Sequence, residues 1–165
     1  MTKSTQARLL RAARVAAKNA YAPFSKLKVG AAVLTANGHI FSGCNIENSS
    51  YGLTVCAERV AIFKAVSAGG REIKAVLVYA DTANLTPPCG ACLQAINEFS
   101  EDPDIVLSNG TSTKTYRLKE LLPLGFRLWG LGHDPKSPEG DSPRRAGTQR
   151  DPVQSPRFRS YPGPS

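Results

Sequence analysis

Three cysteines and a glutamate have the types and the spacing for hydrolytic chemistry at a metal ion. Glu58 follows Cys56 by two residues, and a Cys-x-x-Cys motif formed by Cys89 and Cys92 begins 33 residues after Cys56. Three thiolates can hold one zinc ion and leave its fourth tetrahedral position open for water. Glu58 is spaced to face that water rather than to bind the metal. The pattern therefore predicts a catalytic zinc site with one Zn2+ per chain.

The three cysteines are expected at the beginnings of two helices, where thiolates are stabilised. Cys56 falls near the start of a helical pattern, and Cys89 and Cys92 fall in the first turn of another. Unpaired backbone N–H groups and the positive end of the helix dipole favour negative charge at such places. Because three thiolates on zinc(II) still leave one net negative charge, we expect Arg59 to supply a compensating cation near them.

Other interpretations of these residues stay open at the level of sequence. Cys44 could act as a fourth ligand and close the site, as in a structural zinc centre, or it could be a small buried hydrophobic residue. Arg59 could form a salt bridge in solvent. From outside the enzymes, the rival interpretation is a zinc-stabilised RNA-binding module.

The periodicity of apolar residues predicts which elements position these side chains. Helices are expected over residues 7–20, 55–68 and 89–99. Strands are expected over residues 29–35, 39–43, 73–80, 105–107 and 113–118, with a short turn over 119–122. Asn37-Gly38 is a hairpin signal, and the nearly continuous apolar run over 73–80 is typical of a central strand. The order of elements predicts an α/β fold, a three-layer α/β/α sandwich around a mixed sheet of about five strands.

Composition divides the chain into two parts. The chain has 165 residues, 41% of them hydrophobic, which suits one compact domain with a tail. Proline is frequent and apolar residues are rare in the last 34 residues, so this segment cannot offset its ordering entropy. We therefore expect a catalytic domain over residues 1–131 and a Pro/Arg/Ser-rich disordered tail over residues 132–165.

Charge and hydropathy exclude several classes of partner. The net charge of +8 is spread along the chain, with no Arg stripe, which argues against sequence-specific nucleic-acid binding. No apolar run approaches the roughly 20 residues that span a bilayer, and the polar N-terminus has no signal-peptide core. In a reducing cytosol the spacing of these cysteines favours metal binding over disulfide bonds. We expect a cytoplasmic enzyme with no membrane partner.

Several motifs in a fixed order carry a resemblance that extends over residues 20–126. They are Ala22-Pro23-Phe24-Ser25, Val29-Gly30-Ala31-Ala32, Gly43-Cys44-Asn45-Ile46-Glu47-Asn48, Cys56-Ala57-Glu58-Arg59, Pro88-Cys89-Gly90-Ala91-Cys92 and Glu120-Leu121-Leu122-Pro123. The chain resembles the small homotetrameric cytidine deaminases of pyrimidine salvage. The resemblance implies a cytidine deaminase-like fold and hydrolysis of cytidine and deoxycytidine to uridine and deoxyuridine, with release of ammonia. A related deaminase of a cytosine nucleoside antibiotic, of the blasticidin S type, is the alternative within the enzymes.

The resemblance also implies roles for individual residues. It makes Cys56, Cys89 and Cys92 the zinc ligands and Glu58 the group that shuttles protons. The remaining implied contacts are with the nucleoside: the Asn45 and Glu47 side chains with the ribose hydroxyls, the Ala57 N–H with the ring carbonyl, and the Pro87 carbonyl with the exocyclic amine. Side chains two residues apart on an extended segment point the same way, as one sugar edge requires.

Two aromatic residues and two departures complete the comparison with the family. Tyr51 lies in the family's pocket-lining stretch, and Phe126 matches an aromatic residue supplied across a subunit boundary, which implies a homotetramer. Leu27 stands where the family commonly has an aromatic residue that packs on the pyrimidine, so substrate affinity depends on this position. Leu93 stands where the family often has arginine, and we expect it to affect local packing alone.

Overall fold

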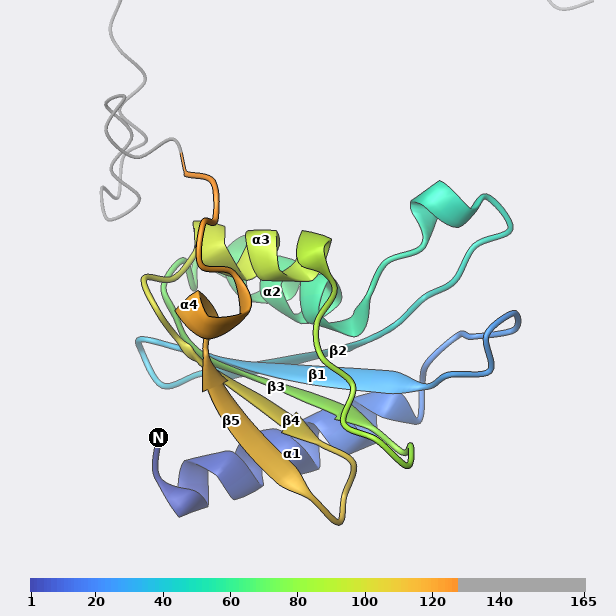
Figure 1. Ribbon diagram of the computed structural model, residues 1–165, viewed down its shortest axis with the longest axis horizontal. Coiled ribbons are helices and arrows are strands. Elements are labelled where there is room, and N and C mark those ends of the chain that lie inside the picture. Colours follow the sequence, from blue (N-terminus) through green and yellow to red (C-terminus); the bar gives the residue numbers. More distant parts are fainter. Residues whose placement is uncertain (128–165) are drawn as a thin grey trace, which may run out of the picture.

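The computed structural model describes residues 1–127, and these form three layers (Figure 1). The elements are α1 (Lys3–Ala17), β1 (Val29–Thr35), β2 (Ile40–Cys44), the 3-10 turn η1 (Tyr51–Leu53), α2 (Ala57–Ser67), β3 (Ile73–Ala80), α3 (Gly90–Glu98), β4 (Asp104–Ser108), β5 (Thr113–Arg117) and α4 (Leu118–Leu121). Helix α1 covers one face of the sheet, and α2 and α3 lie side by side over the other. The predicted α/β fold with three layers is confirmed. The end of the predicted domain at residue 131 and the tail over 132–165 lie outside the described residues.

The mixed sheet has the strand order β2-β1-β3-β4-β5. β3 and β4 run parallel, with α3 in the connection between them, and the other neighbouring strands are antiparallel. The Asn37-Gly38 turn joins β1 to β2, and Gly38 has the positive φ (81°) that such a turn requires. β3 occupies the centre and is buried at all but one position, as its apolar run predicted.

Each face of the sheet has its own hydrophobic core. The alternation of side chains along the strands sends Val76 and Val78 of β3 towards α2 and α3, and Ala75 and Leu77 towards α1. Among residues 1–127, no helix is both long enough and apolar enough to cross a membrane.

The helix boundaries differ from the predicted ones for local reasons. Helix α1 begins four residues earlier than predicted because the Thr2 hydroxyl caps it and accepts from the Thr5 N–H at 3.2 Å. Helix α2 begins at Ala57 because Cys56 is extended and acts as its N-cap residue. The predicted turn over 119–122 is the short helix α4, where the Glu120 carboxylate accepts from the Arg117 N–H at 2.6 Å.

Helix α2 approaches the sheet closely at Gly43 of β2. A Cβ atom at this position would lie 2.7 Å from the Ala61 backbone nitrogen and 2.7 Å from the Val60 side chain. Contacts this short with helix backbone cannot be relieved by turning a side chain. Gly43 therefore sets the distance between the sheet and the helix that carries Glu58.

We predict that Gly43→Ala destabilises the fold by about 1–3 kcal/mol, the usual cost of overpacking a well-packed core. Thermal unfolding followed by circular dichroism measures the loss. An unchanged melting temperature in Gly43→Ala would contradict the close approach of α2 to β2.

Candidate active site

Three cysteine sulfurs meet where α2 and α3 begin. Cys56 is the N-cap residue of α2, Cys89 is the N-cap residue of α3, and Cys92 lies in the first turn of α3. The three Sγ atoms lie within 4.8 Å of one another, and those of Cys56 and Cys89 are 3.9 Å apart. Two sulfurs bound at 2.3 Å in a tetrahedral zinc site would stand about 3.8 Å apart. The donor set and its spacing therefore fit a zinc ion.

Charge at the three sulfurs is influenced by their neighbours. The Cys92 thiol and then the Arg59 guanidinium lower the pKa of the Cys56 thiol to about 5. The pKa of Cys92 is raised, because its hydrogen bond to Cys56 and its own burial both favour the protonated thiol. The hydrogen bond from Cys92 thus favours a thiolate at Cys56 and opposes a second one at Cys92, and a bound metal cation would stabilise both in the ionised form.

The Glu58 side chain lies in the first turn of α2, close to the sulfurs, and is only 4% exposed. Burial raises the pKa of this carboxyl to about 7, and the neighbouring Cys56 thiolate acts in the same direction. A carboxyl group that titrates near neutral pH can both accept and release a proton in one catalytic cycle. This is the property that a general acid–base group needs.

Arg59 faces the sulfurs rather than solvent. Its Nη2 donates to the Thr54 carbonyl at 3.1 Å and lies 3.9 Å from the Cys56 Sγ. Its Nε atom is buried and has no hydrogen-bond partner among the described residues. The guanidinium therefore lies beside the Cys56 sulfur, where a compensating cation is predicted, and not in a surface salt bridge.

A cavity of about 210 Å³ opens beside Glu58. It joins the Glu58 carboxyl and two of the three cysteines to residues of the 25–29 and 45–47 segments. The lining residues are Ser25, Leu27, Val29, Asn45, Glu47, Thr54, Cys56, Ala57, Glu58, Val78, Thr86, Pro87 and Cys89. The structure thus brings most of the predicted substrate-binding residues into one cavity.

Asn45 and Glu47 both hold the loop over residues 22–28 against the cavity. The Asn45 amide donates to the Leu27 carbonyl at 2.8 Å and accepts from the Val29 N–H at 2.9 Å. The Glu47 carboxylate accepts from the Phe24 N–H at 2.8 Å. Each amide atom and the carboxylate have more hydrogen-bonding sites than these contacts use. Both side chains can therefore bind a ligand while they hold the loop.

Tyr51 and Phe126 are the two predicted substrate-binding residues that do not line this cavity. Tyr51 is 75% exposed on η1, which stands away from the three layers, and its ring contacts Phe24 edge-on at 5.8 Å (Figure 1). Phe126 is 67% exposed, yet its carbonyl accepts from Gln94 Nε2 at 2.7 Å and Asn97 Nδ2 at 3.0 Å. Tyr51 therefore does not line the cavity of a single chain, and its place in the substrate pocket stays a prediction.

The two departures from the family have different environments. Leu27 is 36% exposed and lines the cavity, whereas Leu93 of α3 is buried in the hydrophobic core. Cys44 lies outside the group of three sulfurs, so the described residues offer no four-cysteine site.

Five lining residues were not singled out from the sequence: Ser25, Val29, Thr54, Val78 and Thr86. Thr54 and Thr86 precede Cys56 and Cys89 by two and three residues, so their place in the loops that enter α2 and α3 was an available signal. Ser25 ends one of the motifs quoted above.

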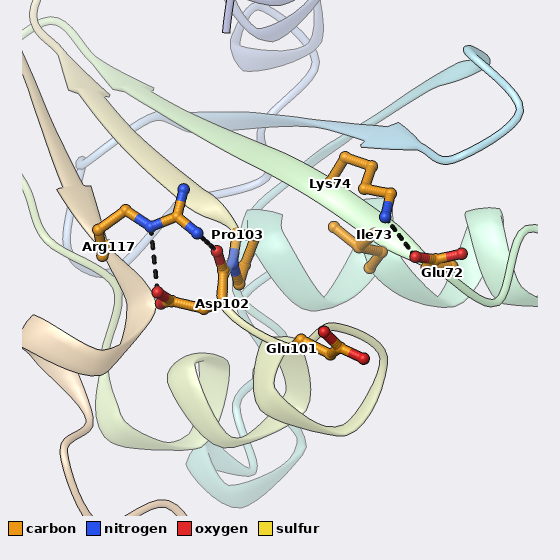
Figure 2. A pocket seen from close by; sticks show the side chains of 7 residues that line it. All are labelled: Glu72, Ile73, Lys74, Glu101, Asp102, Pro103 and Arg117. Atoms are coloured by element: carbon orange, nitrogen blue, oxygen red, sulfur yellow. Dashed lines mark hydrogen bonds and ion pairs between the residues drawn. The ribbon is translucent and has the colours of Figure 1, made fainter. Parts of the chain in front are cut away.

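A second hollow, of about 280 Å³, lies on a different part of the surface (Figure 2). Its charged side chains pair among themselves: Arg117 contacts Asp102, and Lys74 contacts Glu72. Its seven lining residues include no cysteine or histidine, so it lacks the donor set of the first cavity.

Comparisons with known proteins point to the same chemistry. Residues 3–108 match the family pattern described as the cytidine and deoxycytidylate deaminase zinc-binding region. A cytidine deaminase from Sporosarcina psychrophila is 54% identical over 92 residues, which are 56% of this chain and 68% of that protein. A cytidine deaminase from Halalkalibacterium halodurans is 46% identical over 120 residues, which are 72% of this chain and 91% of that protein.

A solved structure and a more distant relative extend the comparison. The cytidine deaminase from Burkholderia pseudomallei has a TM-score of 0.70 at 42% identity, over 76% of this chain and all of that one. A blasticidin-S deaminase from Bacillus cereus is 34% identical over 111 residues, which are 62% of this chain and 79% of that protein. With three sulfurs and a buried carboxyl in the expected arrangement, the chain belongs to the cytidine and deoxycytidylate deaminase family of zinc-dependent hydrolytic deaminases.

Proposed function

We propose that this protein hydrolyses cytidine and deoxycytidine to uridine and deoxyuridine and releases ammonia. The observation that carries the proposal is that one cavity holds both halves of the required chemistry. Cys56, Cys89 and Glu58 form its reactive end, and Asn45 and Glu47 supply hydrogen-bonding groups for sugar hydroxyls. A nucleoside has its reactive base and its hydroxyls at opposite ends, as this cavity requires.

Cys56, Cys89 and Cys92 would hold the zinc ion, whose positive charge would lower the pKa of a water molecule and so provide the nucleophile for hydrolysis. The chain itself moves the protons. Glu58 would accept a proton from the attacking water and pass it to the ring nitrogen beside carbon 4. It would then accept the remaining proton of the hydroxyl added at carbon 4 and pass it to the departing amine, which leaves as ammonia. Burial raises the pKa of this carboxyl, which favours a group that both accepts and releases protons.

Backbone groups at the helix starts would orient the base. The Ala57 N–H is the first of α2 and has no partner within the helix, so it can donate to the ring carbonyl. The Pro87 carbonyl, at the loop that enters α3, would accept from the exocyclic amine. Arg59 would offset the charge of the thiolates, since its guanidinium lies 3.9 Å from the Cys56 sulfur.

Two alternatives have less support. A blasticidin-S deaminase shares the zinc motifs, but its identity to this chain is lower than that of the cytidine deaminases, and Asn45 and Glu47 favour a free ribose. An RNA-binding module would need no buried carboxyl beside the sulfurs. We also propose a cytoplasmic location, because a reducing compartment keeps three thiols available for metal.

Ultraviolet absorbance on mixing with cytidine tests the proposal directly, since the base changes its spectrum when it loses its amine. We expect turnover of cytidine and deoxycytidine. Turnover of blasticidin S or of RNA without turnover of cytidine would overturn the proposal.

Glu58→Gln should keep one zinc per chain and a normal fold, because Glu58 is not a ligand. Its turnover number should fall by at least the usual contribution of a general acid–base group, which is about 10²–10⁴-fold. Cys89→Ala should lose both zinc and activity. Metal analysis and turnover measured on both variants separate the two roles. Loss of zinc from Glu58→Gln, or its near-normal turnover, would contradict the assignment of Glu58.

Leu27→Phe should lower the Michaelis constant for cytidine, with little change in turnover number. Stacking of an aromatic side chain on a base is worth about 1–3 kcal/mol in single-strand binding proteins, and leucine recovers part of it by burial. Steady-state kinetics on the variant and the parent measure the difference. A higher Michaelis constant would mean that another side chain covers the base.

We further propose that the enzyme is a homotetramer in which Phe126 completes the pocket of a neighbouring subunit. This proposal is supported by the environment of Phe126. Gln94 and Asn97 of α3 donate to its backbone carbonyl and fix its position, while its ring stays exposed. Tyr51 and Leu53 on η1 are also largely exposed, and burying such side chains against another copy is favourable by roughly 1.5–3 kcal/mol each.

Phe126→Ala should lower activity without unfolding the chain, because the ring makes no contribution to the core of its own subunit. Light scattering and turnover on the same samples test the proposal, with Phe63→Ala, another exposed aromatic, as the comparison. A parent protein that is monomeric and fully active at nanomolar concentration would contradict the proposal of a shared pocket.

A further inference from the structure

The Ser25 hydroxyl joins two walls of the cavity. Its O–H donates to Glu47 Oε1, and its oxygen accepts from the Leu27 N–H at 3.1 Å. All three residues line the cavity that contains Glu58. One hydroxyl is therefore a donor towards the side chain expected to meet the sugar and an acceptor towards the residue expected to meet the base.

The backbone around this hydroxyl is held in an uncommon conformation. Lys26 has a φ of 60°, the left-handed region, which costs about 1–2 kcal/mol for a residue other than glycine. Its N–H donates to the Ala22 carbonyl at 3.1 Å. This turn directs the Leu27 N–H at Ser25, while the Leu27 carbonyl accepts from Asn45 at 2.8 Å. Both polar backbone groups of Leu27 are thus bound by side chains that line the cavity.

Glu47 keeps capacity for a ligand while it takes part in this arrangement. A carboxylate offers about four acceptor sites. The Phe24 N–H donates to Oε2 and the Ser25 hydroxyl to Oε1, while the Ser25 N–H is shared between both oxygens. Three donors for about four acceptor sites leave one site for a ligand. The hydroxyl of Ser25, with a smaller effect of the Phe24 N–H, lowers the pKa of the Glu47 carboxyl, so it is ionised and can only accept. Its natural ligand is a donor such as a sugar hydroxyl.

We propose that Ser25 is a positioning residue that couples the two ends of the nucleoside pocket, by orienting Glu47 for the sugar hydroxyls and Leu27 for the base through the same oxygen. The inference rests on the proposed function and adds to it a residue that would not itself touch the reacting atoms. It also gives the strained turn at Lys26 a role, because the turn places the Leu27 N–H within reach of the Ser25 oxygen.

The test uses three variants of the zinc-loaded enzyme. Ser25→Ala removes both the donor and the acceptor, and Ser25→Thr keeps both. Ser67→Ala is the matched control, because the Ser67 hydroxyl donates to the Lys64 carbonyl at 3.0 Å on the exposed end of α2, away from the cavity. Each is assayed with cytidine and with 2′,3′-dideoxycytidine, which lacks the hydroxyl donors that Glu47 would bind.

For Ser25→Ala we expect the Michaelis constant for cytidine to rise about tenfold, the order expected when a hydrogen bond to a charged group is lost. Turnover number should stay within about threefold, because ground-state and transition-state binding weaken alike. The rise should be clearly smaller with 2′,3′-dideoxycytidine. Ser25→Thr and Ser67→Ala should resemble the parent enzyme.

A double-mutant cycle with Glu47→Gln separates positioning from a general structural effect. If Ser25 acts through Glu47, replacing Ser25 in the Glu47→Gln background should raise the Michaelis constant far less than tenfold. Should Ser25→Ala fail to fold, Ser25→Cys replaces it, since a thiol is a weak donor and acceptor of similar size.

The outcomes distinguish this inference from the proposed function. A parent enzyme that does not turn over cytidine overturns both. With an active parent, three results overturn the role of Ser25 alone: an unchanged Michaelis constant in Ser25→Ala, an equal rise with 2′,3′-dideoxycytidine, or full additivity with Glu47→Gln.

Discussion

The structure depends on holding three cysteine sulfurs together within 4.8 Å. Thiolates at this distance repel one another, and each further negative charge raises the pKa of the next. The fold meets this constraint with backbone: Cys56 and Cys89 are the N-cap residues of α2 and α3, where unpaired N–H groups and the positive ends of two helix dipoles favour anions. Arg59 adds a full positive charge at the Cys56 sulfur. These groups favour the thiolates that a bound zinc ion would need as ligands.

The same two helix starts bring the other functional groups into place. Glu58 follows Cys56 in the first turn of α2, so it is buried beside the sulfurs and its pKa rises towards neutrality. The closeness of α2 to the sheet depends on Gly43, because any side chain there would meet the backbone of the helix. The segment that leaves β2 links the two ends of the cavity, the one with Glu58 and the one expected to bind the sugar. It does so because Asn45 and Glu47 both hold the loop that carries Leu27.

How far the site could be predicted from the sequence follows from the range of the interactions involved. The ligands and Glu58 were readable because a metal site fixes residue types at short spacings, and β3 was readable because burial on both faces makes an apolar run. The starts of α1 and α2 were misplaced, since they depend on a cap at Thr2 and on an extended Cys56. Ser25 was missed as a lining residue, because its bonds to Glu47 and Leu27 cross 22 and two positions of sequence and leave no periodic signal. No pattern in the sequence reveals that the Tyr51 side chain is exposed in the single chain and absent from the lining of its cavity.

The central claim is that the zinc site has three protein ligands and one open position beside Glu58. X-ray absorption at the zinc edge measures this directly on the purified, zinc-loaded protein. The account predicts three sulfur ligands at about 2.3 Å and one oxygen or nitrogen ligand at about 2.0 Å. The same spectrum should be obtained from Glu58→Gln, because that residue is not a ligand. Four sulfur ligands, which would bring in Cys44 and close the site, would contradict the account.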